Sequence, residues 1–181
     1  MNRPHYQVLC TWGLSGIARL RITADVYIWV DPLSSSPENV LDTDVFADSG
    51  RVVLSTLADA FAVADWVADL QMELQQRLCV LVVCASEDTH SIADQLAAGA
   101  VIERLAQRGL DAISPEAAVA NAAFVQLRGA TSHLISASEV GMKSSLSGLT
   151  LSVDESIKSD QVRILRQSYS ASKLRAIEFM Q

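Results

Sequence analysis

Glycine and proline are scarce in this sequence, with 8 Gly and 4 Pro in 181 residues. Such a chain offers few positions for linkers, and it contains no internal repeat, which argues against a repeat architecture. Only 19% of the residues are charged whereas 50% are hydrophobic, which excludes an intrinsically disordered chain. We therefore expect residues 1–181 to form one domain with a core large enough to fold alone.

Basic residues are also few and scattered. The chain has 14 Lys and Arg against 21 Asp and Glu, which gives a net charge of −7 and no basic stripe. Nucleic acid and anionic membranes are therefore not expected as partners. No apolar run approaches the length that crosses a bilayer, and the N-terminus lacks the apolar segment of a secretory signal. We expect a cytoplasmic protein.

Cysteine occurs three times, always in apolar runs typical of strands: Cys10, Cys79 and Cys84. An odd number of cysteines at such positions favours buried, reduced thiols over disulfides. Cys79 and Cys84 are an odd number of positions apart on one predicted strand. Their side chains should therefore point to opposite faces, which argues against a metal site that both thiols share.

What the sequence does contain is an alternation of strands and helices. Runs rich in β-branched and aromatic residues predict strands at 6–11, 24–31, 50–56, 78–85 and 161–165. Helices are predicted at 57–78, 91–109, 115–129 and 132–140, with an amphipathic segment at 171–180. Because the strand at 78–85 is apolar throughout, we expect helices on both faces of the sheet. The predicted fold is a three-layer α/β/α sandwich with a mostly apolar, mixed or parallel sheet.

Several helix ends carry local signals. Ser91 is a predicted N-cap with Asp94 in the N3 position, and Gly109 is the predicted stop of the same helix. Ser114 followed by Pro115 predicts the start of the next helix. The short stretch 42–49 predicts a tight return, which would place the third strand beside one of the first two.

Five stretches carry a family resemblance: WGLSGIARL (12–20), ADVYIWVDPLSSSPENV (24–40), LADAFAVADWV (57–67), VVCASEDTHSIADQLAAGAVIERL (82–105) and SPEAAVANAAF (114–124). Together they resemble the 2-phosphosulfolactate phosphatases in their bacterial form. The resemblance implies an α/β hydrolase that uses Mg²⁺ to remove phosphate from a small phosphorylated acid. Compared with the family pattern, the chain is shortened after its serine-rich loop, which indicates an internal deletion.

The candidate site residues follow predicted strands. Asp31 ends one strand, and Ser34 and Ser35 follow it, so these three are the predicted catalytic residues. Asp31, Glu87 and Asp94 are the predicted metal ligands, because Mg²⁺ prefers carboxylates together with water and substrate oxygens. Helix N–H groups beside the serines would donate hydrogen bonds to the phosphate.

Each of these residues also has a structural interpretation. The serines can serve as turn and N-cap residues, and Asp94 can cap its helix. No Lys or Arg lies in residues 31–49 or 85–98, so phosphate should bind only through the metal.

Two functions therefore stay open. The chain is either a Mg²⁺-dependent phosphatase or a catalytically inactive relative that acts as a binding or assembly protein. Because the chain has lost an element of the family pattern, we expect the uncovered surface to be buried in a homodimer.

Overall fold

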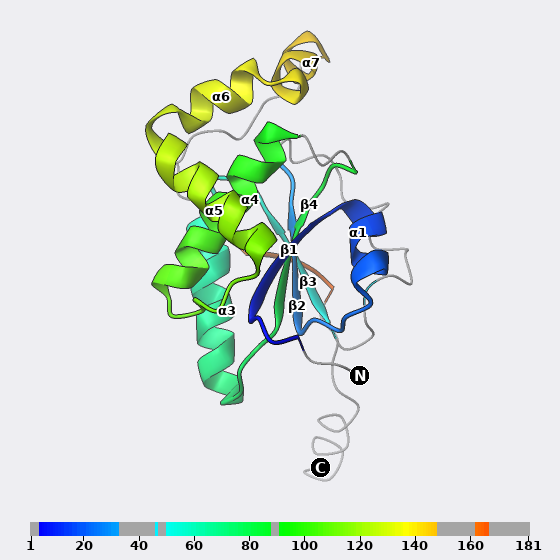
Figure 1. Cartoon of the computed structure of the whole chain (residues 1–181), viewed down its shortest axis with the longest axis vertical. Coiled ribbons are helices and arrows are strands. Elements are labelled where there is room, and N and C mark those ends of the chain that lie inside the picture. The colour runs from blue at the N-terminus through cyan, green and yellow to red at the C-terminus, as the bar shows by residue number, and fades with distance from the viewer. Residues whose placement is uncertain (1–3, 33–45, 47–49, 88–90, 148–161, 167–181) are drawn as a thin grey trace, which may run out of the picture.

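The structure is a computed structural model that describes residues 4–32, 46, 50–87, 91–147 and 162–166 (Figure 1). Its strands are β1 (Val8–Trp12), β2 (Val26–Val30), β3 (Arg51–Ser55), β4 (Val80–Cys84) and β5 (Arg163–Arg166). Its helices are α1 (Gly13–Leu20), α3 (Ala60–Leu74), α4 (Ile92–Gln107), α5 (Pro115–Leu127), α6 (Thr131–Ala137) and α7 (Glu139–Ser147). A 3-10 turn, η1 (Arg128–Ala130), joins α5 to α6.

The strands form one sheet in the order β1-β4-β2-β3-β5. The first four strands of this order are parallel, and β5 pairs with β3 in the antiparallel direction at the edge. Every residue of β2 and of β4, in the interior of the sheet, is buried. A parallel sheet is covered on both faces, which explains why these strands carry apolar side chains without alternation. The predicted α/β fold is thus confirmed in its general form.

Side chains of each strand alternate between the two faces of the sheet. Ile28 and Val82 lie in the cluster packed against α3, α4 and α5, whereas Leu81 lies in the opposite cluster with Ile17 of α1 and Phe46. Figure 1 shows α3, α4 and α5 on one side of the sheet and α1 on the other. Among the residues described, every helix is too short or too polar to cross a lipid bilayer.

The stretch 42–49, predicted as a tight return, lies outside the described residues except for Phe46. β2 and β3 are parallel, with Val26 opposite Arg51. Parallel neighbours are not joined by a hairpin turn, because the chain must first run back along the sheet. The prediction that the third strand lies beside one of the first two is confirmed.

Two helical features differ from the sequence prediction. α1 was not predicted as a helix at all. The single helix predicted at 132–140 is two helices, α6 and α7, separated at Ser138. Ser138 has an extended backbone conformation, and its Oγ accepts a hydrogen bond from the N–H of Gly141 (3.1 Å). Ser138 therefore caps α7 and ends α6.

The predicted caps are confirmed. Ser91 Oγ accepts from the N–H of Asp94, and Ser114 Oγ accepts from the N–H of Ala117, with Pro115 at the first position of α5. α4 ends at Gln107, close to the predicted stop, while α5 gives way to η1 before the predicted end at residue 129. The amphipathic segment predicted at 171–180 lies outside the described residues.

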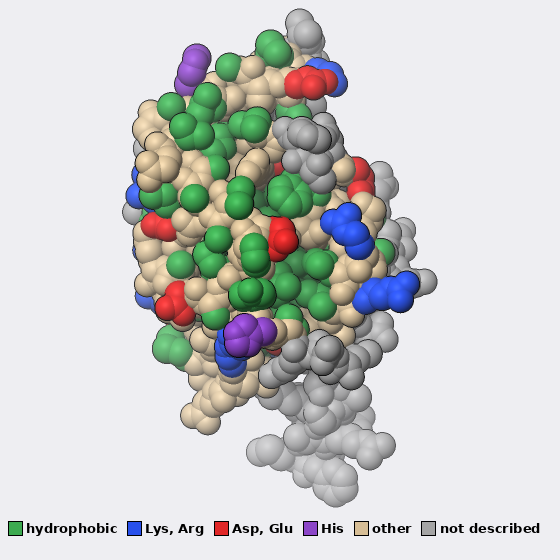
Figure 2. All heavy atoms as spheres, viewed as in Figure 1, with side chains coloured by type: hydrophobic (Ala, Val, Ile, Leu, Met, Phe, Trp, Pro, Cys, Tyr) green, Lys and Arg blue, Asp and Glu red, His purple; other side chains and the backbone are tan. Residues whose placement is uncertain are grey.

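The charged side chains are dispersed on the face shown in Figure 2, where Lys and Arg form no stripe. Hydrophobic side chains gather on the same face. Helix α5 exposes three hydrophobic side chains, namely Val119 (61% exposed), Val125 and Leu127. An α5 that is apolar on its outer as well as its inner side is unusual for a surface helix.

Helices α4 and α5 approach closely at Gly99. A Cβ built there would collide with the backbone oxygen of Ala120 and lie 2.7 Å from the Cβ of Phe124. We expect Gly99→Ala to push the helices apart and to lower the free energy of unfolding by about 1 to 3 kcal/mol. Gly129→Ala is the matched control, because its added Cβ meets no atom within 4 Å. Urea denaturation that finds both variants equally stable would contradict this packing.

Candidate functional site

The candidate site lies at the carboxyl ends of the parallel strands, where α/β folds bind ligands. Asp31 directly follows β2, and its N–H donates to the carbonyl of Ser55 (3.0 Å). Glu87 follows β4, and Asp94 lies in the first turn of α4, the helix that comes next in the chain. Because β2 and β4 are neighbours in the sheet, these three acids come from adjacent strand ends.

Asp94 is a buried carboxyl group, with 4% of the residue exposed. Burial is the main cause that raises the pKa of Asp94 to about 6, and the charge of Asp31 raises it further. Hydrogen bonds with the Ser91 hydroxyl and the Ser86 backbone act in the opposite direction. Asp31 is itself buried. Two buried carboxyl groups therefore lie within electrostatic reach of each other.

Glu87 has a different environment, at the N-terminus of α1. Its Oε1 accepts hydrogen bonds from the N–H groups of Leu14 (2.8 Å) and Ser15 (3.3 Å), and its Oε2 accepts from the Ser15 hydroxyl. The Ser15 hydroxyl is the main cause that lowers the pKa of Glu87. The carboxylate satisfies amide groups that have no partner inside the helix, and it lies at the positive end of the helix dipole.

Gly13 makes this contact possible. Its φ of +57° is in the left-handed region, and a Cβ at this position would collide with the Glu87 carboxyl group. Glycine alone combines this backbone conformation with the space that the carboxylate occupies. The junction of β1 with α1 and the loop after β4 are thus joined through one side chain.

The structure brings together part of the predicted metal-ligand set. Asp31 and Asp94 interact, whereas the carboxylate of Glu87 is held by the first turn of α1. Within the described part of the chain, no group of three His, Cys, Asp or Glu side chains is arranged to hold a metal ion. Ser34 and Ser35 lie outside the described residues.

A cavity of about 360 Å³ lies next to the Asp94 carboxyl group. Its lining residues come from the loop after β4, the start of α4 and the start of α7: Ser86, Ser91, Ile92, Ser138, Glu139, Val140 and Lys143. Ser86 and Ser91 both hydrogen-bond with Asp94, so the cavity lies close to Asp94, although neither Asp94 nor Asp31 is among its lining residues. Lys143 Nζ lies 2.5 Å from Glu139 Oε1, and this hydrogen bond raises the pKa of Lys143.

Lys143 and Ser15 are the residues that the sequence analysis missed. Lys143 is far along the chain from both acidic loops, so inspection of those loops found no cation. Ser15 is in α1, which was not predicted as a helix. The Gly13-Leu14-Ser15 stretch, with glycine directly after an apolar strand, was the available signal for a helix N-terminus at this point.

The thiols play a structural part. Cys79 and Cys84 lie in the clusters on opposite faces of the sheet, as predicted, and Cys10 lies in the same cluster as Cys84. Hydrogen bonding with Cys10, followed by burial, raises the pKa of Cys84 well above its ordinary value. A thiol in this environment stays protonated at neutral pH and is a poor nucleophile.

No protein-family model and no curated protein matches this chain.

The contact between Gly13 and Glu87 gives a test by double mutation. We expect Glu87→Ala to lower the free energy of unfolding by about 0.5 to 2 kcal/mol, because α1 loses its N-terminal acceptor. Gly13→Ala should cost at least as much, because it strains the backbone and displaces the same carboxylate. The double variant should lose less free energy of unfolding than the sum of the losses in the two single variants. Strict additivity in urea denaturation would show that the two residues do not act on each other.

The raised pKa of Asp94 predicts a dependence of stability on pH. The folded state holds this proton up to about pH 6, whereas the ordinary pKa of an aspartate is 3.8. The stabilising contribution of the group is therefore full below about pH 4 and is lost as the pH rises through about 6. Asp94→Asn cannot ionise, so between pH 4 and pH 7 its stability should rise relative to wild type by about 1 to 3 kcal/mol.

Asp31→Asn supplies the matched comparison. This substitution removes the charge that raises the pKa of Asp94, so the carboxyl carbon of Asp94 should titrate at lower pH in the variant when followed by NMR. An unchanged titration would contradict the interaction between the two groups.

Proposed function

We propose that this chain is a Mg²⁺-dependent phosphatase of the 2-phosphosulfolactate phosphatase type, acting on a small phosphorylated acid. The observation that supports this proposal is the pair of buried carboxyl groups, Asp31 and Asp94, beside a cavity lined by serine hydroxyls and a lysine. The pair lies where α/β folds bind ligands, at the carboxyl ends of the strands.

The donor chemistry of Asp31 and Asp94 fits a divalent cation. Mg²⁺ is bound in phosphate-transferring sites by one or two carboxylates together with water and substrate oxygens. A cation next to both groups would relieve the repulsion that raises the pKa of Asp94. When bound, Mg²⁺ supplies positive charge that offsets the charge of the phosphoryl group in the transition state. Glu87 could bind the same cation only if its carboxylate gave up its hydrogen bonds with the first turn of α1.

The phosphate group of the substrate is proposed to lie in the cavity at the start of α4. The helix N-terminus favours an anion there, and the hydroxyls of Ser86 and Ser91 can donate to phosphate oxygens. Lys143 supplies a positive charge that the sequence analysis did not expect near the site. If Lys143 left Glu139 and paired with a substrate oxygen instead, it would bind either the phosphate or the second acidic group of the substrate. Asp31, with Ser34 and Ser35, remains the proposed catalytic set.

A catalytically inactive relative is the second candidate, and the state of Glu87 favours it. This carboxylate already caps α1, so one of the three predicted metal ligands has a structural use. A protein that keeps this cap and the hydrophobic surface of α5 could serve as a binding or assembly protein without turnover.

The proposal also covers the protein as a whole. We propose that residues 1–181 form one domain with the three-layer α/β/α arrangement expected from the sequence, and that the protein acts in the cytoplasm. We propose a homodimer as well, supported by the exposed Val119, Val125 and Leu127 of α5, because large exposed apolar patches mark interaction surfaces. Sedimentation at micromolar concentration would decide this point, since a strictly monomeric mass contradicts it.

The metal proposal is tested by calorimetry and by assays with aryl phosphates. We expect wild type to bind Mg²⁺ and to hydrolyse the ester in a reaction that EDTA abolishes. Asp31→Asn should weaken Mg²⁺ binding by about tenfold or more and remove turnover, because it removes one of two ligand charges.

Asp111→Asn is the matched control, since Asp111 is an exposed residue near the start of β1 and should leave both measurements unchanged. Turnover without metal, or full activity in Asp31→Asn, would show that the chemistry lies elsewhere. A folded wild type that neither binds Mg²⁺ nor turns over ester would favour the inactive relative.

A further inference from the structure

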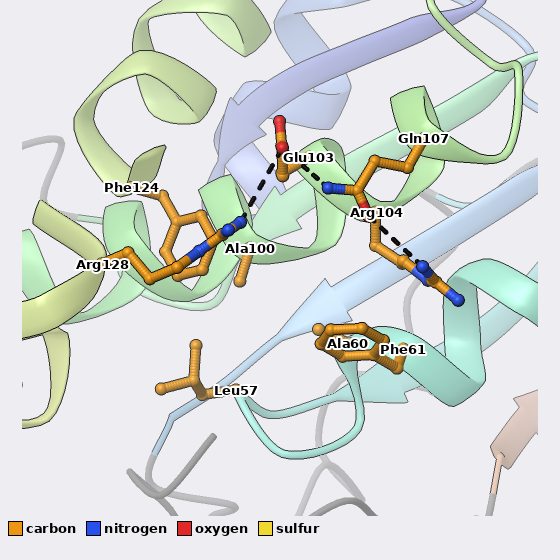
Figure 3. Close-up of a pocket in the computed structure, with 9 residues that line it drawn as sticks. All are labelled: Leu57, Ala60, Phe61, Ala100, Glu103, Arg104, Gln107, Phe124 and Arg128. Carbon is orange, nitrogen blue, oxygen red and sulfur yellow. Dashed lines mark hydrogen bonds and ion pairs between the residues drawn. The ribbon is translucent and has the colours of Figure 1, made fainter. Parts of the chain in front are cut away.

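A second cavity, of about 130 Å³, lies in the helical layer formed by α3, α4 and α5, at the second half of α4 (Figure 3). Its lining comes from the start of α3, the second half of α4 and the end of α5 with η1: Leu57, Ala60, Phe61, Ala100, Glu103, Arg104, Gln107, Phe124 and Arg128. None of these residues belongs to the candidate site described above. The volume is close to the roughly 150 Å³ of a protein cavity that holds benzene.

Two stacks of an arginine on a phenylalanine form opposite walls of this cavity. The Arg104 guanidinium lies 4.7 Å from the ring centroid of Phe61, and the Arg128 guanidinium lies 5.0 Å from that of Phe124. Figure 3 shows the two stacks on either side, with Glu103 between them. Each ring keeps its guanidinium in place by a cation–π contact, so the two charges are positioned before any ligand arrives.

Hydrogen-bond donors outnumber acceptors around this cavity. Glu103 is the only acid in the lining, and it already accepts from Gln107 (2.8 Å) and Asn121 (3.1 Å). Arg128 reaches it only at 3.8 Å. Arg104 pairs with Asp65 (3.2 Å) and donates to Gln107 Oε1 (3.3 Å). Because Glu103 is already engaged by two closer donors, Arg128 has room for a further acceptor group.

The charge of the lining points to an anion. Two arginines, Arg104 and Arg128, line the cavity together with one carboxylate, Glu103, while Asp65, the partner of Arg104, is not in the lining. Apart from Gln107, the rest of the lining is apolar, with Leu57, Ala60 and the two phenyl rings, and it cannot solvate a phosphate dianion. An apolar body of one ring or a short branched chain would fit this part of the cavity.

We infer that this cavity binds a small organic carboxylate whose apolar body lies between Phe61 and Phe124 and whose carboxylate pairs with Arg128 and Arg104. The carboxylate would give Arg128 a closer acceptor than Glu103, which lies 3.8 Å from it. Arginine suits this role because its planar fork of donors matches the two oxygens of a carboxylate. The site is independent of the proposed phosphatase chemistry.

The test uses sodium benzoate as the probe with the full-length protein, followed by calorimetry and by ligand-observed NMR. We expect a Kd of about a millimolar or below, as is usual for a ligand of this size. Benzyl alcohol has the same ring without the charge, and inorganic phosphate has charge without an apolar body. Both should bind at least about tenfold more weakly, since each lacks one half of the recognition.

Two variants locate the site. Arg128→Met keeps an apolar stem and removes the charge, and it should weaken benzoate binding by about tenfold or more. Arg108→Met is the matched control, because Arg108 lies on the same helix layer, pairs with Asp65 and Asp69, and does not line the cavity. Ala100→Leu should block binding by filling the cavity.

Three results would overturn the inference. They are equal benzoate affinity in Arg128→Met and Arg108→Met, equal affinity of wild type for benzoate and benzyl alcohol, and no benzoate binding by folded wild type up to the solubility of the salt. The first comparison does not depend on the folding of Ala100→Leu, so a misfolded Leu variant leaves the test intact.

Discussion

β2 and β4, two adjacent strands in the interior of the sheet, are buried along their whole length, and the rest of the structure follows from covering them. A parallel pair of this kind needs helical layers and crossovers, because the chain must return to the same end of the sheet before each strand. α4 covers the middle of one face, and it is itself enclosed by α3 and α5, with most of its residues from Ala93 to Leu105 buried. The return crossovers place every strand-to-helix junction at one edge, so polar residues that follow strands gather there without any specific attraction.

At that edge, the protein uses similar carboxyl groups for opposite electrostatic purposes. Glu87 is exposed, accepts two backbone amides, and has a lowered pKa, so it stabilises the fold when ionised and its contribution is lost as the pH falls. Asp94 is buried beside Asp31 and has a raised pKa, so its ionised form is the one that costs free energy. The first group is therefore committed to the fold, whereas the second stores an unfavourable charge. A stored charge of this kind is typical of functional sites, although structural networks can also produce it.

The sequence predicted the sheet well because burial on both faces leaves a strong local pattern. All five strands and the caps Ser91 and Ser114 lie where runs of apolar residues and cap chemistry place them. Strand direction has no such local pattern, which is why the connection from β2 to β3 was expected to be a tight return. α1 was missed although Gly13 directly after an apolar strand was a local signal, because the contact that fixes its start, from the N–H of Leu14 to Glu87, spans 73 residues of the chain.

The same limit applied to the candidate site. Asp31, Glu87 and Asp94 could be placed at one edge from strand order alone, but the partner of each could not. Whether a carboxylate faces a helix N-terminus or another carboxylate depends on packing at the level of single side chains. Lys143 enters the site only because Ser138 ends α6 and starts α7 in a new direction.

α4 contributes to both of the cavities described above, and its length explains their different character. Its first turn contributes Ser91 and Ile92 to the larger cavity, where amide groups and the positive end of the helix dipole would favour an anion. Its last turns contribute Glu103, Arg104 and Gln107 to the smaller cavity, where the dipole gives no help and any anion must be held by side chains. Arginine held on a phenyl ring meets that need, because the ring replaces part of the hydration that the guanidinium loses. A chain with an overall negative charge can in this way offer positive charge at both ends of one buried helix. At the start of α4 the charge comes from backbone amides, and near its end it comes from arginines stacked on phenyl rings.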